Sequence, residues 1–547
     1  MKTQKIALLA AGLTTLAGPS LAQTTEVFSS KDVNGQVVVA PLSAEEKERL
    51  QDPLFRLVLA QRPDEIRLAK IEEMIQPDRT KRRIFVVDEE IKNPRPPQSR
   101  RAVIDFLGSN QGVQLDRNVM LSITFSSERV PEITDVEAWG WDDTKGVYNY
   151  YKLDRADTPT RSWKLRATSE NADIRTAQER EGSCIACHVS GAPIMKELLF
   201  PWNNWHSNRS QAAYLLPDTP PEKRWRVATD PGLSGLSEAQ TLEGVIMGSI
   251  KGFNNRRFEQ LVRRVDQGGF VVEDARRVLR PLFETTEVNF ISNSQPSNLH
   301  PLGDTPQTGP SQPIAIPNSF FLASALFGGG SDLAGSGGLG IAEATQFRSV
   351  AVIQPAEYKT LIEKSGVKLR TSENPPRTLR GDTHFAWFVP ETAFVANHWI
   401  DTLLREKVVT PAFVAAVLAA DLETPIFSTG RARLLAFVPA SFSGTSGEPH
   451  PDRLTRDVIA RLEAANPAAG SVEADFLATL KSPNPLDVVK AKIVAYKDRI
   501  SQRLSNPSTR NDELERLFGL LIARRQAVQG HPVLGNLIES EALLPLP

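Results

Sequence analysis

Five consecutive residues of this chain could together hold a redox cofactor. They are Cys184-Ile185-Ala186-Cys187-His188, which include both cysteines of the 547-residue chain. The pattern Cys-x-x-Cys-His is the attachment sequence of a c-type haem. Each thiol can add across a haem vinyl group, and the histidine that follows is placed to take the proximal axial position on the iron. The sequence therefore predicts one covalent haem c, attached at Cys184 and Cys187 and ligated by His188.

Two other chemistries use a Cys-x-x-Cys pair. A thioredoxin-like redox pair needs a βαβ setting, which the flanking sequence does not show. A closed structural zinc site needs two further ligands, typically a second close pair. The chain has no third cysteine, and no two of its seven histidines have the spacing His-x(3–5)-His. Haem attachment is therefore the favoured interpretation of the motif.

The N-terminal residues have the features of an export signal. Lys2 and Lys5 form a positively charged segment. Residues 6–17 are apolar or small, and a small-residue cleavage site follows at Ala22. The apolar run is too short to span a bilayer, which favours a secretory signal peptide over residues 1–22. A buried N-terminal helix is the alternative.

Charge and composition limit the classes of partner. The chain has 64 basic and 65 acidic residues, and loss of two lysines with the signal peptide lowers the net charge from −1 to −3. This balance does not favour nucleic acid or an anionic membrane as a partner. No later apolar run is long enough to span a membrane. The expected partner is a periplasmic redox protein or a small-molecule substrate.

The apolar pattern predicts an α+β multidomain protein. Strand-like runs cover 84–87, 103–107, 120–125 and 162–166, and 136–141 with 146–151 read as a hairpin around a four-residue turn. The aromatic residues of this hairpin could form a ligand surface, but we favour one packed face of a sheet. The predicted division is a signal peptide (1–22), an N-terminal arm and helices (23–82), a β-rich domain (83–170), a helical haem domain (171–291), a Pro/Gly-rich loop region (292–345) and a mainly α-helical domain (346–547).

Helical periodicity is strongest in the C-terminal third. A first helical stretch over 44–76 is interrupted by Pro53 and Pro63, after a polar segment, 23–42, that we expect to be an extended arm. Further predicted helices cover 238–247, 256–267, 273–287, 393–406, 411–420, 452–464, 472–480, 485–504 and 511–528.

Residues 172–290 resemble a class I cytochrome c domain. The resemblance rests on the motif at 184–188, an apolar loop after it and helices around a downstream methionine, and it covers about a fifth of the chain. In c-type cytochromes haem is attached on the far side of the bacterial inner membrane. The resemblance thus implies a periplasmic protein and agrees with the export signal.

The resemblance also suggests the distal iron ligand. Met247 lies 59 residues after His188, near the separation usual in that family between the two axial ligands. A methionine at helical spacing is more often part of a core, so His206, Met195 and an open or water-bound position stay as alternatives. His300 could reach the site, but nothing selects it.

Two functions follow from the resemblance. The first is electron transfer by a six-coordinate haem with His188 and Met247 as axial ligands. The second is a haem enzyme with an open distal site, similar in concept to a peroxidase, oxygenase or isomerase acting on a small substrate. A structural or sensing role is a third. The sequence singles out no catalytic residue, since His384 and His398 near aromatic segments are more often structural.

Overall fold

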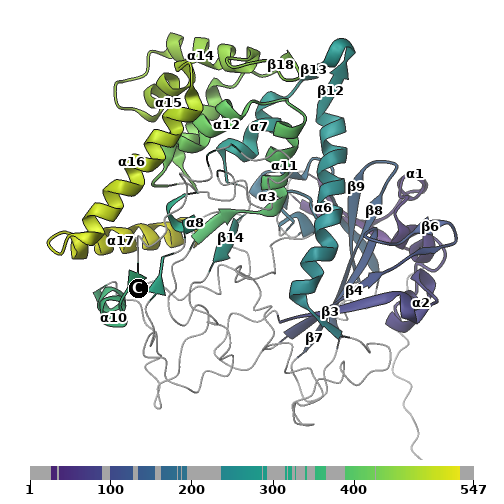
Figure 1. Cartoon of the computed structure of the whole chain (residues 1–547). Coiled ribbons are helices and arrows are strands. Elements are labelled where there is room, and N and C mark those ends of the chain that lie inside the picture. The colour runs from purple at the N-terminus through teal and green to yellow at the C-terminus, as the bar shows by residue number, and fades with distance from the viewer. Residues whose placement is uncertain are drawn as a thin grey trace, which may run out of the picture.

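The computed structural model confirms an α+β architecture with a β-rich N-terminal region and a helical C-terminal region (Figure 1). It describes residues 26–33, 36–88, 99–126, 133–153, 162–180, 183–186, 188–193, 236–285, 288–291, 314–316, 318–322, 327, 339, 341, 352–364, 389–424 and 427–529. The signal-peptide residues 1–22, most of the loop region 292–345, and the alternatives Met195, His206, His300 and His384 lie outside these residues. In the part of the chain described, no helix is long and apolar enough to cross a membrane.

A nine-stranded sheet organises the N-terminal region. Its strand order is β11-β3-β4-β7-β8-β9-β10-β1-β2. The strands are β1 (Phe28–Val33), β2 (Gln36–Pro41), β3 (Arg82–Asp88), β4 (Ser99–Phe106), β7 (Val119–Ser126), β8 (Ile133–Asp142), β9 (Val147–Leu153), β10 (Trp163–Thr168) and β11 (Leu236–Glu238). Every strand predicted between 84 and 166 is confirmed. The predicted hairpin is β8 and β9, with Asp142 opposite Val147 and Gly146 at a φ of 68° in the four-residue turn.

Both edges of the sheet are built by segments that are distant in the chain. β1 pairs in parallel with β10 and antiparallel with β2. The polar segment expected to be an extended arm is therefore a hairpin of the sheet, because its backbone groups bond to β10. At the other edge β11 pairs in parallel with β3. A two-stranded ribbon of β5 (Ser109–Asn110) and β6 (Val113–Gln114) lies outside the main sheet.

Side chains alternate between the two faces of the sheet, and both faces are buried. On the first face Ile84, Ile104 and Leu121 lie in register across three strands. They share a core with η1 (Phe55–Leu59) and α2 (Leu68–Ile75). The short α1 (Ala44–Glu48) precedes these helices and starts in a capping box made by Ser43 and Glu46.

The second face carries aromatic residues and meets the haem motif. Trp139 of β8 and Tyr150 of β9 lie opposite each other in the register. As favoured from the sequence, the hairpin aromatics other than Tyr151, which lies in the core of the other face, thus form a packed face of the sheet. Ile185 of the motif and the apolar side of α6 (Ala239–Leu261) pack on this face. We call this group of side chains the motif-side cluster.

The C-terminal region is a layer of helices around a core of aliphatic and aromatic side chains. All six helices predicted between 393 and 528 are confirmed. They are α11 (Phe394–Arg405), α12 (Pro411–Leu418), α14 (Arg453–Ala465), α15 (Val472–Lys481), α16 (Pro485–Ser505) and α17 (Arg510–Gln529), joined by α7 (Ala275–Phe283), α8 (Asn318–Phe321), α10 (Pro355–Lys364) and α13 (Thr429–Leu434). A small sheet of β12 (Val262–Val265), β13 (Gly269–Val272) and β18 (Phe442–Thr445) covers one end.

Helix α6 differs from the two helices predicted over 238–247 and 256–267. It is continuous through Gly248 and Gly252, and residues 262–265 form a strand instead. Within the helix Gly248 lies against the Arg117 guanidinium, which would have to move if the position carried a side chain. The strand forms because Val262 to Val265 pair with β13, a contact that helical periodicity cannot show.

Residues 171–291, predicted as the haem domain, contribute to two cores. In α6, Leu242 to Phe253 pack in the motif-side cluster, whereas Phe258 belongs to the core of the C-terminal helices. Helix α7 packs entirely in that second core. Figure 1 shows α6 running between the sheet and the helices. This helix therefore links the two regions.

Candidate functional site

The haem motif is held in a series of tight turns beside the sheet. It follows α3 (Ala177–Arg180) and begins in a 3-10 turn, η4 (Cys184–Ala186). The N–H of His188 donates to the carbonyl of Cys184 at 2.9 Å, and the N–H of Gly191 donates to that of His188 at 2.8 Å. Cys184 is half-buried. Cys187 lies outside the described residues.

A backbone hydrogen bond orients the ring of His188. Its Nδ1 lies 2.8 Å from the carbonyl oxygen of Ala192. Because a carbonyl only accepts, Nδ1 carries the hydrogen, and in the neutral ring Nε2 then has the lone pair. Metal-ligating histidines usually have this arrangement, with the second nitrogen donating to a carbonyl or carboxylate. The motif histidine is thus in the tautomer that iron ligation through Nε2 requires.

Tyr150 of β9 supports the same ring from the sheet. The two ring centroids lie 4.7 Å apart with an interplanar angle of 33°. The Tyr150 hydroxyl lies 2.7 Å from the carbonyl of Gly191 and 2.8 Å from that of Ala192, and it can donate to either. Since Tyr150 is buried, the hydroxyl ties the turn after His188 to a rigid strand.

Gly191 allows this turn to approach the sheet. Its φ is 84°, in the left-handed region that favours glycine. A Cβ at this position would lie 2.8 Å from the Cβ of Ser169 and 3.0 Å from that of Ala172. The Ser169 hydroxyl in turn accepts from the N–H of Tyr148 at 2.8 Å. The close backbone approach is what brings the Ala192 carbonyl within reach of both His188 and Tyr150.

Met247 is brought to the same side of the sheet as the motif. Leu242, Ile246 and Ile250 are one turn of α6 apart and bury their side chains in the motif-side cluster. Met247 is half-buried, and both it and Cys184 pack against that cluster. The structure therefore places the predicted distal ligand and one attachment cysteine against one group of apolar side chains.

An arginine-rich group lies next to the motif. Asp173 accepts from Arg257 and Arg277 at 2.8 Å, and its backbone carbonyl accepts from Arg280 at 3.0 Å. Burial alone would raise the pKa of Asp173, but the two guanidinium groups hold that pKa below its ordinary value. A small cavity lined by these residues also touches Ser190, two residues after His188. The group fixes the motif segment to α6 and α7 and gives its surroundings excess positive charge.

His398 has a different environment from the motif histidine. It lies in α11, where its Nδ1 accepts from the Asn254 side-chain amide at 3.2 Å. Burial lowers the pKa of His398 to about 4, although Asp401 acts in the opposite direction. The ring is therefore neutral at pH 7. Because Asn254 belongs to α6, this contact joins α6 to α11.

Sequence reasoning missed the residues that position the motif histidine. The four residues Tyr148-Asn149-Tyr150-Tyr151 were recognised as part of a strand, but nothing in their spacing showed which tyrosine faces the motif. The strand alternation decides this, because Tyr151 lies in the core of the other face. Nothing in the sequence indicated a role for Asp173, because its hydrogen-bond partners are 84 and 104 residues away.

Three comparisons with known proteins found no match. No protein-family model, no curated protein and no solved structure matches this chain. Within the described part of the chain, no group of three or more His, Cys, Asp and Glu side chains could hold a metal ion.

Proposed function

We propose that this protein is a periplasmic monohaem c-type cytochrome that transfers single electrons. One haem c would be bound through thioethers to Cys184 and Cys187, with His188 as the proximal ligand. The observation that carries this proposal is the hydrogen bond from His188 Nδ1 to the Ala192 carbonyl. It leaves Nε2 as the ligating atom, and the pattern Cys-x-x-Cys-His already specifies the attachment.

In this proposal, the residues around the motif orient the proximal ligand and set the environment of the haem. A haem supplies one-electron chemistry when bound, with a potential set by its axial ligands and surroundings. Tyr150 and the Ala192 carbonyl hold the His188 ring in one orientation. The motif-side cluster excludes water, which disfavours extra positive charge on the iron and raises the potential. Arg257, Arg277 and Asp173 together have one net positive charge, which would favour a neighbouring haem carboxylate.

We propose Met247 as the distal ligand. The support is its separation of 59 residues from His188 and its packing against the same cluster as Cys184. A thioether in that position raises the reduction potential relative to a second histidine. An exported electron carrier of this kind would exchange electrons with a periplasmic redox partner.

The attachment is tested with the full chain exported in cells that mature c-type haem. Purified protein is denatured in gel electrophoresis and stained for haem, which retains only covalently bound cofactor. We expect a haem-positive band at the full mature mass. The double variant Cys184→Ala with Cys187→Ala should lose the band completely. A haem-positive band from the double variant, or a haem-negative wild type, would refute the proposal.

The distal ligand is tested by spectra of the reduced haem protein with and without carbon monoxide. We expect low-spin bands and little response to carbon monoxide, because Met247 occupies the sixth position. Met247→Leu should create strong carbon monoxide binding, whereas Met120→Leu, in the same cluster, should not. Both changes keep side-chain volume, which limits their effect on stability. Strong carbon monoxide binding by the wild type would instead support an enzyme with an open distal site.

A further inference from the structure

The aromatic rings of the motif-side cluster form a series of contacts that starts at the motif histidine. The ring of His188 lies against that of Tyr150, with centroids 4.7 Å apart. Tyr150 and Tyr148 are two residues apart in β9 and therefore lie on the same face of the sheet, with ring centroids 6.4 Å apart. The ring of Tyr148 in turn lies 4.8 Å from that of Trp141 in β8. The series thus leads from the predicted iron ligand to the end of the hairpin.

Burial decreases along this series. Tyr150 and Tyr148 are each 2% exposed, whereas Trp141 is half-buried and packs against the cluster from its edge in the sequence of β8. Trp141 directly precedes the hairpin turn, in which Asp143 and Lys145 are exposed. The series therefore begins at a buried ring beside the motif and ends at a ring that is partly open to solvent.

Tyr148 is the ring that connects the others. Besides Tyr150 and Trp141 it contacts Trp139, with centroids 5.0 Å apart, and Phe253 of α6, with centroids 6.0 Å apart. Tilted and edge-to-face contacts at such distances are usual for packed aromatic rings. Core packing alone would explain the contacts, so the chemical identity of the rings decides what else they can do.

The rings between His188 and the surface are phenols and an indole, which are the most electron-rich aromatic side chains. In each of them a lone pair on oxygen or nitrogen is delocalised into the ring, which raises the energy of the highest filled orbital. An electron that tunnels through such rings meets a lower barrier than in aliphatic side chains. A series of them in contact couples two redox centres that lie at its ends.

A carboxylate raises the filled orbitals of Trp141 further. Its indole Nε1–H donates to Oδ1 of Asp143 at 3.3 Å, and a negative charge beside the ring makes it easier to oxidise. The indoles of Trp163 and Trp399 donate to neutral backbone carbonyls instead. The ring at the surface end of the series thus has the environment that best favours passage of an electron.

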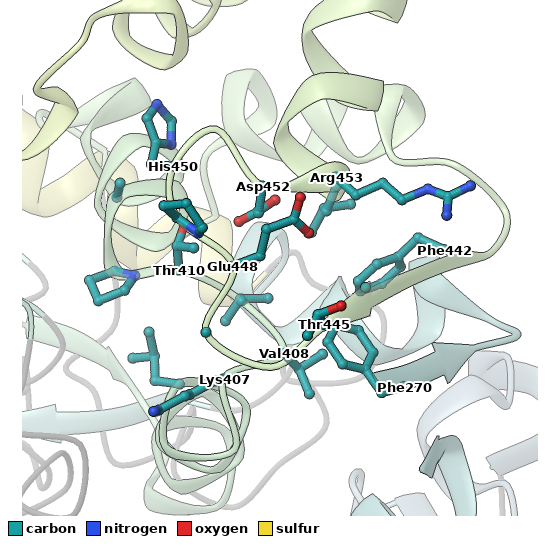
Figure 2. A pocket seen from close by; sticks show the side chains of 18 of the residues that line it. Phe270, Lys407, Val408, Thr410, Phe442, Thr445, Glu448, His450, Asp452 and Arg453 are labelled. Carbon is teal, nitrogen blue, oxygen red and sulfur yellow. The ribbon is translucent and has the colours of Figure 1, made fainter. Parts of the chain in front are cut away.

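The aromatic contacts of the C-terminal region have a different composition. Each aromatic pair among its described helices and small sheet includes a phenylalanine, which has no lone pair in conjugation with its ring. One pair, Phe270 and Phe442, lies at the side of a pocket of about 470 Å³ between the small sheet, α11, α12 and the start of α14, which Asp452 and His450 also line (Figure 2). Series of electron-rich rings therefore distinguish the sheet from the helices.

We propose that Tyr150, Tyr148 and Trp141 form an electron-transfer route between the haem and a one-electron redox protein that contacts Trp141. This inference rests on the haem attachment proposed for this chain. In the transfer, one electron leaves iron(II), which becomes iron(III), and reaches the oxidised centre of the partner. The rings are neither oxidised nor reduced, and no proton moves. Burial raises the pKa of the Tyr148 hydroxyl, which favours a phenol that keeps its proton.

The route is tested with a photo-oxidant attached beside Trp141 in the full-length protein. Lys145→His provides an exposed position on the turn for a rhenium(I) tricarbonyl phenanthroline label, whose excited state takes one electron from a nearby indole. Transient absorption then follows the indole radical. The chain that retains Lys145, treated with the same reagent, gives the background from the native histidines.

The first measurement needs no haem. In the labelled chain with Cys184→Ala and Cys187→Ala, the light pulse should produce the indole radical, and Trp141→Phe should abolish it. Should this haem-free chain not fold, the oxidised haem protein takes its place, because iron(III) cannot supply the missing electron. Absence of the radical, or its persistence in Trp141→Phe, would overturn the assignment of Trp141.

The second measurement uses the labelled protein with its haem reduced. The radical should decay faster than without reduced haem, and iron(II) should be oxidised at the same rate, since the electron returns to Trp141 through Tyr150 and Tyr148. Equal decay with and without reduced haem would overturn the route. A chain that binds no covalent haem in the gel stain would refute the proposed function instead, so the two failures are distinguishable.

Ring substitutions locate the route. Tyr148→Leu removes the ring between Trp141 and Tyr150 and should slow the decay to the rate measured without reduced haem. Phe258→Leu is the control, because it removes a buried ring of α6 that belongs to the other core, and should leave the decay unchanged. Circular dichroism verifies folding, and Tyr150→Leu replaces Tyr148→Leu if the latter does not fold. Unchanged decay in the folded tyrosine variant, or equal slowing in Phe258→Leu, would overturn the route.

Discussion

The motif site on the sheet and the pocket between the helices differ in how their buried polar atoms are hydrogen-bonded. Beside the motif, the His188 ring and the Tyr150 hydroxyl are bonded to carbonyls of the same short turn. In the pocket, Asp452 and His450 each have one polar atom bonded to the chain and one buried polar atom without a partner among the residues that the structure describes. The first arrangement fixes a side chain in place, as ligation requires. The second leaves buried acceptor atoms unsatisfied, which costs free energy.

The two regions also differ in how their elements meet. The sheet is completed by β1 and β11, which come from before and after its consecutive strands. The C-terminal helices pack both on neighbours in sequence, such as α14 on α15 and α16 on α17, and on more distant helices, such as α12 on α16, and α6, α7, α8, α10 and the small sheet join the same core. Because α6 contributes to both cores, whether the regions unfold separately depends on how strongly this helix couples them.

The largest expected effect comes from two matched tryptophans. Trp163 in the sheet and Trp399 in α11 are both fully buried, and each indole N–H donates to a backbone carbonyl, that of Glu65 or Val278. Trp163→Ala and Trp399→Ala should each lower the free energy of unfolding by about 3–5 kcal/mol. Hydrogen exchange read by mass spectrometry should show lost protection in β7–β9 for the first variant and in α12–α16 for the second.

This pair tests the separation of the two regions. If Trp163→Ala and Trp399→Ala exposed the same amides, the sheet and the helices would form one cooperative unit through α6. Circular dichroism at low temperature serves as the control, since both variants should remain folded there for their exchange patterns to be compared.

A smaller effect distinguishes the two faces of the sheet. Tyr151 donates to Oδ2 of the buried Asp52 at 2.6 Å on one face, whereas Tyr150 contacts the motif on the other. Tyr151→Phe should lower the free energy of unfolding by about 1–3 kcal/mol, because the acceptor is a buried carboxyl. Tyr150→Phe should lower the free energy of unfolding by about 1 kcal/mol and should also shift the reduction potential of the proposed haem, which voltammetry measures.

Each tyrosine variant is the control for the other. The potential should stay constant in Tyr151→Phe, since Tyr151 faces away from the motif. A potential that moves equally in both variants would mean that it responds to general loosening of β9. An unchanged potential in Tyr150→Phe would mean that the hydroxyl does not influence the ligand.

At pH 7 the smallest effect is that of a pH dependence at the junction of the regions, because it develops only below pH 6.5. Burial lowers the pKa of His398 from 6.5 to about 4, with Asp401 raising it and Arg405 and Lys251 lowering it further. Because the folded state binds this proton less readily than the unfolded state, stability should fall as the pH decreases from 6.5 to about 4. His398→Gln should remove this part of the dependence.

Urea midpoints measured every half unit of pH give the comparison between wild type and His398→Gln. Carboxyl groups titrate in the same window in both proteins, so the difference between the two curves is the informative quantity. Parallel curves between pH 4 and 6.5 would contradict the assignment to His398.

Much of the secondary structure could be predicted from local patterns. The strands between 84 and 166, the hairpin around Gly146 and the six C-terminal helices follow from apolar periodicity and turn residues. The errors occurred where long-range pairing decides the structure. The segment before residue 42 joins the sheet through β10, and residues 262–265 form a strand through β13.

For the candidate site, too, local sequence predicts some features and only the tertiary structure shows the others. The order of residues alone predicts the thiols, the histidine and the haem, because thioether chemistry depends on the short spacing from Cys184 to His188. The tautomer of His188 depends on Ala192, four residues away, and the support of its ring on Tyr150, which only the folded sheet brings there. Met247 was selected by resemblance, and the structure adds its packing against the same cluster as Cys184.

By itself, the sequence determined the local elements, and it predicts haem attachment and an export signal, since each depends on residues within a few turns of one another. Tertiary structure decided which face of the sheet receives the motif, the continuous course of α6 and the existence of the Asp452 pocket. These features arise from contacts between residues tens to hundreds of positions apart. Such contacts form when apolar faces bury one another, and the periodicity of a single element shows that it has such a face without showing its partner.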